Sequence, residues 1–451
     1  MPLSSIKSEK GEVSQRKGSL EIIKSIELDE ETKSCTFSYE EDGEKVSGSF
    51  EYHAKKTTLR EELTGELAKT KGAEFREFGR KFEQLGLADM GFAIYTRRNQ
   101  REAALEKGEK MDPPNVYILG HGWTGTKDIY SEIPMETQMS MVEAIMEQDP
   151  DAIVVTMDGN GFGDSPFRTE VLEDEALLKE KIRPESYADQ IQFLSEEVLG
   201  VPLEEVSYVG HSMGGAAAFE LSTRGCGSCV ALSPAAFPTE ELLGEAEVIS
   251  RKSKNLLQEA LNKLGSIKGL NLSTLVYEVL GTSVRFGEAF GQISSQAEKI
   301  SEAVVGQVFE LLSNYLLGAE LDPETRKALV GIHKSQLTAQ RFPAVSNAIL
   351  ELKEGMPLED FAENSENLIV FQGESDVLVR PEDLKRTAAS VLVKTLESSQ
   401  WDENDPAVKK IVVLVEQLLD ESQIVTGGHY AQVYNPTVPK VVASMHPNKR
   451  S

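Results

Sequence analysis

The chain has 451 residues, 40% of them hydrophobic, and its 47 Lys and Arg residues against 74 Asp and Glu residues give a formal net charge of −27. This length suits one large domain with insertions or two domains, and so acidic a chain is unsuited to bind nucleic acid or an anionic membrane surface. Neither a signal peptide nor an apolar run long enough to span a bilayer stands out in the sequence, so we expect a cytoplasmic protein.

Residues 1–88 are expected to form an N-terminal extension. Residues 1–18 are polar, which favours disorder. From Ser19 to His53 apolar residues alternate with polar ones between acidic breaks, a pattern typical of a small antiparallel β-meander. Residues 57–87 are rich in Leu, Glu, Lys and Ala and predict a helix interrupted near Gly72. None of these features carries recognisable chemistry, although the meander could bind a protein partner.

Two later parts of the chain, residues 89–238 and 366–451, have the pattern of an α/β core. Short, continuously apolar runs alternate there with helical stretches. Strands that are apolar along their whole length are buried on both faces, so this pattern predicts a mostly parallel sheet covered by helices on both faces. The expected strands are residues 91–97, 115–119, 152–157, 206–209, 229–232, 367–371 and 423–426. Helices are expected at residues 381–396 and 407–419, between the last two strands.

Residues 239–365 separate these two parts and differ from both. Their apolar residues recur at helical spacing, and runs typical of strands are missing. One such apolar stripe consists of Ile300, Val304, Val308, Leu311 and Tyr315. Packing between helices explains this stripe better than a binding groove does. The segment therefore predicts a helical insertion, which we expect to cover one edge of the sheet as a cap.

The most informative motif is Gly-His-Ser-Met-Gly at residues 210–214. An apolar strand precedes it, and small residues suited to a closely packed helix follow it. Strand, sharp turn and helix are the context in which Gly-x-Ser-x-Gly presents a nucleophilic serine, and the helix N-terminus offers N–H groups to an anion. Ser212 is therefore a candidate nucleophile, with an ordinary serine in a glycine-rich turn as the alternative.

Two further residues complete a candidate catalytic triad. A nucleophilic serine needs a base within hydrogen-bond reach and an acid that orients the base. Asp376 and His429 follow Ser212 along the chain, and each of the three comes directly after an expected strand, so all three should meet at one edge of the sheet. Other carboxylates compete with Asp376 for the acid's place, namely Glu374, Glu382 and Asp383.

Five motifs in this chain resemble the successive signatures of the α/β-hydrolase superfamily, most closely its cap-bearing branch of serine esterases. They are Gly-His-Gly-Trp-Thr-Gly at 120–125, Asp-Gly-Asn-Gly-Phe-Gly-Asp-Ser at 158–165, Gly-His-Ser-Met-Gly-Gly at 210–215, Gly-Glu-Ser-Asp at 373–376 and Gly-Gly-His at 427–429. The similarity covers roughly residues 90–237 and 366–446. It implies an α/β-hydrolase fold with a mostly parallel, eight-stranded-type sheet, helices on both faces and a helical cap.

The resemblance also implies roles for single residues. Ser212 corresponds to the nucleophile, His429 to the general base and Asp376 to the orienting acid. The oxyanion would be bound by the backbone N–H groups of Trp123 and Met213. His121, in the first motif, belongs either to this oxyanion loop or to the core, and Asn160 stands where many relatives carry Arg.

The implied activity is hydrolysis of a small ester-like substrate, such as a carboxylic ester or thioester, through an acyl-enzyme. A serine in place of an aspartate at the elbow argues against dehalogenase and epoxide hydrolase chemistry. Acyl transfer to another acceptor, cofactor-free peroxidation and ligand binding without turnover are the alternatives. No cofactor is implied.

Cysteine usage indicates neither disulfides nor a metal. Three cysteines, Cys35, Cys226 and Cys229, are too few for a disulfide framework in a chain of this length. Cys226 and Cys229 have the spacing of a redox motif, but they precede an apolar strand where such a motif would open a helix, so we expect a structural role. No second Cys or His pair lies at zinc-site spacing, and the sequence predicts no metal site.

Overall fold

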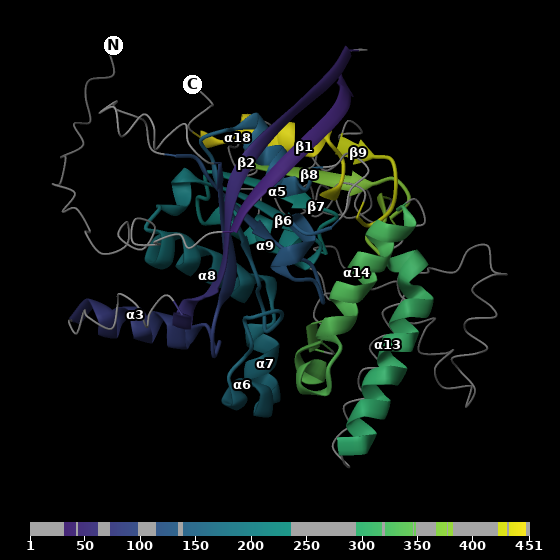
Figure 1. Cartoon of the computed structure of the whole chain (residues 1–451). Coiled ribbons are helices and arrows are strands. Elements are labelled where there is room, and N and C mark those ends of the chain that lie inside the picture. Colours follow the sequence, from purple (N-terminus) through teal and green to yellow (C-terminus); the bar gives the residue numbers. More distant parts are fainter. Residues whose placement is uncertain are drawn as a thin grey trace, which may run out of the picture.

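The protein is described by a computed structural model, shown in Figure 1. The structure describes residues 31–41, 44–61, 73–97, 114–133, 139–235, 295–317, 321–345, 347–348, 367–376, 378–381, 423–430 and 433–447. Residues 1–18, residues 239–294 of the expected cap and the expected helix at 407–419 lie outside this part of the chain. The expected helix at 381–396 also lies outside it beyond its first residue.

Nine strands form one sheet in the order β1-β2-β3-β5-β4-β6-β7-β8-β9. Their bounds are β1 (Glu31–Glu41), β2 (Glu44–Thr58), β3 (Gly91–Arg97), β4 (Val116–Gly120), β5 (Ile153–Met157), β6 (Val206–His211), β7 (Ser228–Leu232), β8 (Leu368–Gly373) and β9 (Ile424–Val425). Neighbouring strands are parallel from β5 to β9, whereas β1, β2 and β3 pair antiparallel. The expected mostly parallel sheet is confirmed, and each strand expected for the core forms.

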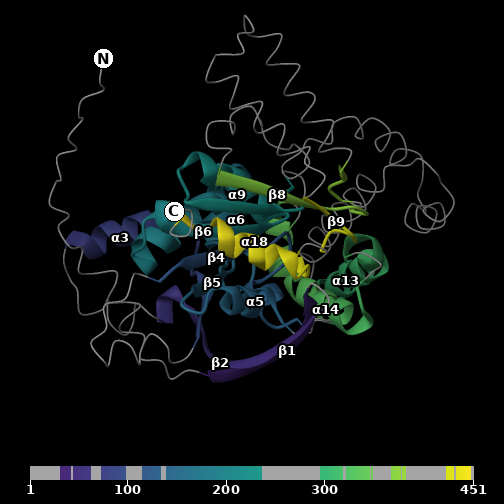
Figure 2. The same cartoon turned by 90° about the horizontal axis from the view of Figure 1, so that it is seen from above.

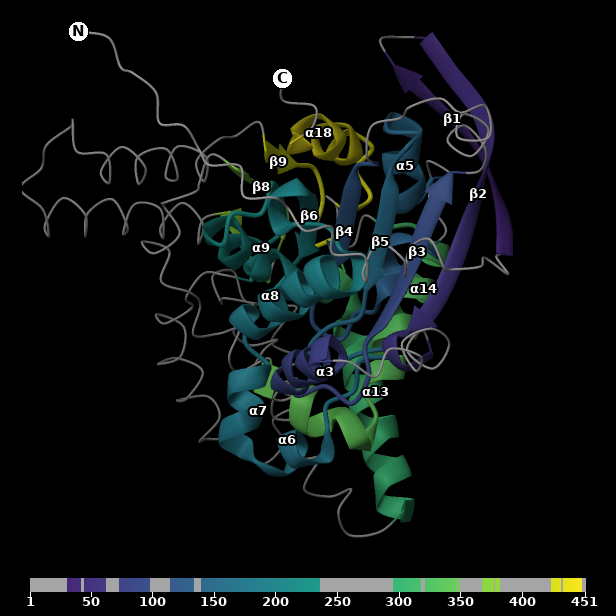
Figure 3. The same cartoon turned by 90° about the vertical axis from the view of Figure 1, so that its left-hand side faces the viewer.

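The described part of the expected N-terminal meander is a hairpin of β1 and β2 that continues the central sheet, whereas its expected first run, at residues 19–30, lies outside the described residues. Cys35 pairs with Phe50 across the hairpin, and Tyr52 of β2 pairs with Arg97 of β3. Alternating burial of Cys35 and Phe37 on β1 follows the alternating sequence pattern. Strands β2 to β9 supply the expected eight-strand arrangement, and β1 adds a ninth strand at the edge, on the outer side of β3 (Figure 3).

The expectation of a helix from residue 57 is wrong at its start. Strand β2 continues to Thr58, which pairs with Gly91 of β3. Pairing with a neighbouring strand outweighs the helical composition there, because strand formation depends strongly on the partner and on burial. The described helix of this part is α3 (Ala73–Gln84), and its Phe78 packs against Phe193 with ring centroids 5.1 Å apart.

Helices cover both faces of the sheet. Helix α8 (Pro184–Phe193) packs on α9 (Met213–Thr223), and α5 (Met141–Gln148) packs on α18 (Thr437–Met445). Figure 2 shows α9 and α5 on opposite sides of the strands. Strands β4 to β7 lie between these layers and are buried along their whole length. Burial on both faces explains why these strands are continuously apolar.

The described part of the 239–365 segment is helical. Helix α13 (Ser295–Leu317) packs on α14 (Pro323–Gln336), which Asp322 caps by accepting hydrogen bonds from the first turn. The expected apolar stripe is wrong at Val304, which is 38% exposed, because the buried face of α13 runs through Val305 and Phe309. Among the described residues, no helix is long and apolar enough to cross a membrane.

Candidate active site

Ser212 occupies the turn between β6 and α9. Its backbone has φ +53° and ψ −110°, a region that non-glycine residues rarely adopt. Three hydrogen bonds hold it there: Ser212 N donates to Leu232 O at 2.8 Å, and Ser212 O accepts from the N–H groups of Ala216 and Ala235, each at 2.9 Å. The surrounding structure therefore overdetermines a strained conformation, as is common at functional sites.

Glycines on both sides of Ser212 make this turn possible. A Cβ atom on Gly210 would lie 2.0 Å from the carbonyl oxygen of Gly214, and one on Gly214 would lie 2.4 Å from the carbonyl oxygen of Gly120. Strand, helix and the loop after β4 thus meet backbone to backbone. The motif Gly-x-Ser-x-Gly is required here by close approach, which only glycine permits.

Asp376 and His429 form a buried pair. Asp376 Oδ2 lies 2.8 Å from His429 Nδ1, and the two side chains are 0% and 5% exposed. Because a carboxylate accepts hydrogen bonds, Nδ1 is the protonated ring nitrogen, which leaves the proton-accepting lone pair on Nε2. Asp376 Oδ1 accepts from the backbone N–H groups of Leu378 and Val379 at 2.8 and 3.0 Å. These bonds fix the carboxylate against the imidazole.

The rival carboxylates are placed differently. Glu374 is exposed, whereas Glu382 and Asp383 lie outside the described residues. Gln372, which the sequence did not single out, donates from Nε2 to Asp376 Oδ2 at 3.0 Å. It lies four residues before Asp376 at the end of β8, and an amide just before a candidate acid is a signal that could have indicated a supporting role.

Strand order brings His429 to the edge of the sheet at which Ser212 lies. Strands β6, β7, β8 and β9 are consecutive and parallel, so their carboxyl ends share one edge of the sheet. His211, directly before Ser212, contacts His429: its Nε2 lies 2.9 Å from the carbonyl oxygen of His429 and the ring centroids are 4.7 Å apart. Burial lowers the pKa of His211 well below its usual value, so this ring is a neutral support.

The two candidate oxyanion donors lie on loops that meet at Ser212. Met213 is the first residue of α9, where a backbone N–H has no partner within the helix. Trp123 follows Gly122, whose added Cβ would lie 2.8 Å from Ser212 Cβ. Gly214 N donates to His121 O at 3.1 Å and pins the loop to the elbow. These contacts bring the backbone segments of both predicted donors close to Ser212.

His121 is a buried structural residue. Its Nε2 accepts from Gly159 N at 3.0 Å, so Nδ1 carries the proton and donates to Gly122 O at 2.7 Å. Burial lowers the pKa of His121, which favours this neutral form. The ring thereby connects the loop after β4 to the Asp-Gly-Asn-Gly loop after β5. These contacts fit the interpretation of His121 as a core residue.

The motif at 158–165 holds a buried ion pair. Asp158 accepts from the Lys127 backbone at 2.7 Å and from Lys127 Nζ at 2.7 Å, and its side chain is fully buried. Lys127 was not predicted, because a lysine after a glycine-rich loop carries no sequence signal of burial. Asn160 donates from Nδ2 to Ile182 O at 2.9 Å, so it supports the neighbouring chain from inside the fold.

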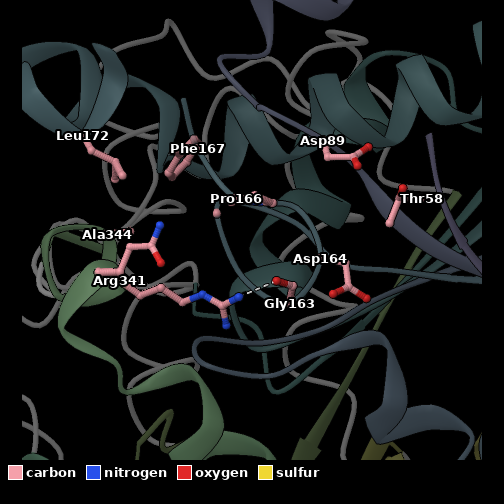
Figure 4. A pocket seen from close by; sticks show the side chains of 11 residues that line it. Thr58, Asp89, Gly163, Asp164, Pro166, Phe167, Leu172, Arg341 and Ala344 are labelled. Atoms are coloured by element: carbon pink, nitrogen blue, oxygen red, sulfur yellow. Dashed lines mark hydrogen bonds between the residues drawn. The ribbon is translucent and has the colours of Figure 1, made fainter. Parts of the chain in front are cut away.

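A cavity of about 350 Å³ lies beside this loop (Figure 4). The side chains of Phe167 and Leu172 form an apolar part of its lining. The Arg341 guanidinium, which also lines the cavity, donates a hydrogen bond to Gly163 O at 2.6 Å. The cavity is bounded by the loop after β5, by the N-terminal segment at Asp89 and by the helical segment at Arg341. Ser212, Asp376 and His429 are not among the residues that line this cavity.

The order of β2 to β9, with β3 antiparallel to β5 and an elbow serine after β6, matches the arrangement implied by the sequence motifs. Asp376 and His429, the candidate acid and base, follow β8 and β9, so the three candidate residues have the chain order Ser, Asp, His. The chain has the α/β-hydrolase fold. Within the described residues of this fold, no three His, Cys, Asp or Glu side chains come together as a metal site.

Comparison with known proteins is limited to solved structures, since no protein-family model and no curated protein matches the chain. A thermophilic esterase from Thermogutta terrifontis is 15% identical, with 79% of this chain and 95% of that one covered and a TM-score of 0.43. An esterase from Exiguobacterium antarcticum is 11% identical, with 79% of this chain and 96% of that one covered and a TM-score of 0.40. A bromoperoxidase from Bacillus anthracis is 14% identical, with 81% of this chain and 98% of that one covered and a TM-score of 0.41. Matches this distant carry no argument about activity.

Proposed function

We propose that the chain is a serine hydrolase that cleaves a small ester-like substrate, such as a carboxylic ester or thioester. The observation that supports this most is the buried 2.8 Å pair of Asp376 and His429 beside the strained elbow of Ser212. An acid that orients a histidine, next to a serine at a helix N-terminus, meets the requirements of nucleophilic catalysis. The site needs no cofactor for this reaction.

In the proposed reaction His429 Nε2 takes the proton of Ser212 Oγ while that oxygen attacks the substrate carbonyl. Asp376 keeps the proton on Nδ1 and stabilises the imidazolium that forms. His429 then protonates the leaving group, which departs and leaves an acyl-enzyme. A water molecule that gives its proton to His429 attacks the acyl group, and Ser212 is released with the carboxylic acid product.

Two backbone N–H groups, those of Trp123 and Met213, are proposed to stabilise the oxyanion of each tetrahedral intermediate. Such preorganised donors contribute several kcal/mol in known hydrolases, about 3–4 kcal/mol for a single donor. Support comes from the close approach of the Gly122 backbone to Ser212 and from the N–H groups at the start of α9. Backbone donors also explain why glycines dominate both motifs.

The helical segment is proposed to act as a cap that governs substrate size. Support comes from the indole nitrogen of Trp123, which donates to Val345 O at 3.0 Å and so ties this segment to the oxyanion loop. The corresponding division of the chain is an extension at 1–88, core parts at 89–238 and 366–451 and the cap at 239–365. Trimming the cap should then change the acyl-chain-length profile on a panel of esters.

A fluorophosphonate probe tests the activity itself. Only a serine with an active base and oxyanion donors reacts with such a probe at neutral pH. We expect one adduct per chain, mapped to Ser212 by mass spectrometry, that disappears in Ser212→Ala and falls sharply in His429→Ala. Ser444→Ala, an exposed serine of α18, is the matched control and should label normally.

The outcomes separate the alternatives. Folded protein without an adduct would contradict the enzyme proposal and leave ligand binding without turnover. An adduct without hydrolysis of any ester on a broad panel would indicate acyl transfer to an acceptor other than water, or peroxidation.

A further inference from the structure

A fourth histidine lies between the loop after β4 and the loop that carries His429. His333 of α14 is 3% exposed, and its ring packs on Phe309 of α13 with centroids 5.2 Å apart. Its Nδ1 lies 2.8 Å from Thr124 Oγ1, and its Nε2 lies 2.7 Å from the Tyr430 hydroxyl. One imidazole therefore contacts the residue after Trp123 and the residue after His429.

The hydrogen bonds around His333 run in one direction. Thr124 Oγ1 donates to Trp123 O at 2.8 Å, so the same oxygen accepts from the Nδ1–H of His333. The remaining nitrogen, Nε2, then accepts from the Tyr430 hydroxyl. Burial lowers the pKa of His333 to about 3, so the ring is neutral at ordinary pH and this single tautomer satisfies every partner.

The oxyanion loop needs such support because it is strained. Thr124 has φ +53°, a left-handed conformation that is unfavourable for a β-branched residue. Strain of this kind persists only where neighbouring contacts overdetermine the backbone. The helical segment supplies two of them, the bond from His333 to Thr124 and the bond from the Trp123 indole to Val345 O.

Tyr430 extends the support to the base. Its ring packs against His211 with centroids 4.3 Å apart and stands nearly perpendicular to the His429 ring, at 5.7 Å and 84°. Fixing the Tyr430 hydroxyl therefore limits the movement of the loop that carries His429. Through His333, helix α14 is therefore hydrogen-bonded both to the loop after β4 and to the loop that carries His429.

We propose that His333 is a positioning residue, which sets the oxyanion loop and the His429 loop at the spacing that the reaction at Ser212 requires. The proposal rests on the hydrolase function proposed above. His333 acts through Thr124 and Tyr430, so its loss should lower kcat and leave KM nearly unchanged. Misplacement of catalytic groups by about 1 Å can cost about 100-fold in rate.

Three substitutions separate the two bonds. His333→Asn places an amide where Nδ1 stands and can keep the bond to Thr124, whereas His333→Gln places its amide where Nε2 stands and can keep the bond to Tyr430. His333→Leu removes both bonds and retains bulk. The control is Leu329→Ala, a fully buried residue one turn earlier on α14, whose aliphatic side chain cannot hydrogen-bond.

The kinetic measurement is the turnover of an activated aryl ester together with the labelling rate of Ser212. We expect His333→Leu to lower kcat and labelling about 10- to 100-fold. His333→Asn and His333→Gln should each recover part of that loss, while Leu329→Ala lowers the melting temperature without a comparable loss of kcat. If Leu329→Ala lost as much kcat as His333→Leu, His333 would be a packing residue only and the proposal would be wrong.

A second measurement is independent of catalysis. The chain has two tryptophans, Trp123 and Trp401, so Trp401→Phe leaves one indole signal in an NMR spectrum. In His333→Leu the indole N–H of Trp123 should exchange with water at least about tenfold faster, because its loop opens more often. Unchanged exchange would overturn the proposal even in a protein that hydrolyses esters. Faster exchange in a protein without a Ser212 adduct would support the loop contact and contradict the hydrolase function.

Discussion

The loop after β4, which borders Ser212, is held by two regions of the molecule through different kinds of contact. One region is the elbow at Ser212, and the other is the helical segment. The elbow and the loop after β4 meet through backbone atoms, as in the 3.1 Å bond from Gly214 N to His121 O. The helical segment reaches the same loop through side chains, from His333 to Thr124 and from the Trp123 indole to Val345 O. Backbone contacts tolerate no added atom, whereas side-chain contacts can be replaced one at a time. A single substitution at the elbow should therefore cause a large loss of stability or activity, whereas substitutions in the helical segment should cause smaller, separate losses.

The largest effect should come from Asp376, the proposed acid, which follows β8 on the core side of Ser212. In Asp376→Asn the amide nitrogen can face the Nδ1–H of His429, which favours the wrong tautomer of the base. We expect turnover to fall about 10⁴-fold with the fold retained. Circular dichroism and ester hydrolysis check this prediction. Glu374→Gln, an exposed neighbour in the same loop, is the control, and a larger loss in that variant would mean that the acid is Glu374.

A single methyl group should break the backbone contact itself. The Cβ of Gly210→Ala would lie 2.0 Å from Gly214 O, and neither backbone can move without shifting β6 or α9. We expect a loss of about 3 kcal/mol in the free energy of unfolding, at the upper end of overpacking effects. Urea denaturation measures it. A variant as stable as the parent would show that the elbow can relax.

Acid should weaken the side-chain contact. The pKa of His333 is lowered from 6.5 to about 3 by burial, so between these values the unfolded chain binds a proton that the folded protein does not. The associated stability is fully present above the unfolded value and is lost as the pH falls toward the folded one. From pH 8 to about pH 5, the free energy of unfolding should drop about 2 kcal/mol more in the parent than in His333→Gln. Equal drops in urea titrations would contradict this.

The smallest effect should be a gain in stability on the helical side. Gly331 lies in the interior of α14, and in the described part of the chain no atom comes within 4 Å of an added Cβ. Gly331→Ala should raise the free energy of unfolding by about 0.5–1 kcal/mol and leave turnover unchanged. The same glycine-to-alanine change would thus have opposite signs at Gly331 and Gly210. If Gly331→Ala were less stable than the parent, the predicted difference between the helical segment and the elbow would be wrong.

Short-range patterns predicted the sheet and, together with the resemblance to α/β-hydrolases, the pairing of Asp376 with His429. Ser212, Asp376 and His429 each follow a strand, and a parallel sheet brings the carboxyl ends of its strands to one edge. The 2.8 Å contact of Asp376 with His429 follows from that arrangement. The roles of these residues in a reaction stay predictions until the labelling experiment is done.

Contacts between elements could not be read from the sequence. Thr124 and His333 are 209 residues apart, and Lys127 meets Asp158 inside the fold. Nothing in the sequence around His333 or Lys127 distinguishes these buried side chains from exposed ones. Pairing with β3 also overrode helical composition at Thr58, and the way α13 packs left Val304 exposed. Strand periodicity and turn chemistry are encoded within a few neighbouring residues. Which polar groups are buried, and which atoms they meet, depends instead on how whole elements pack against one another, and only the tertiary structure contains that information.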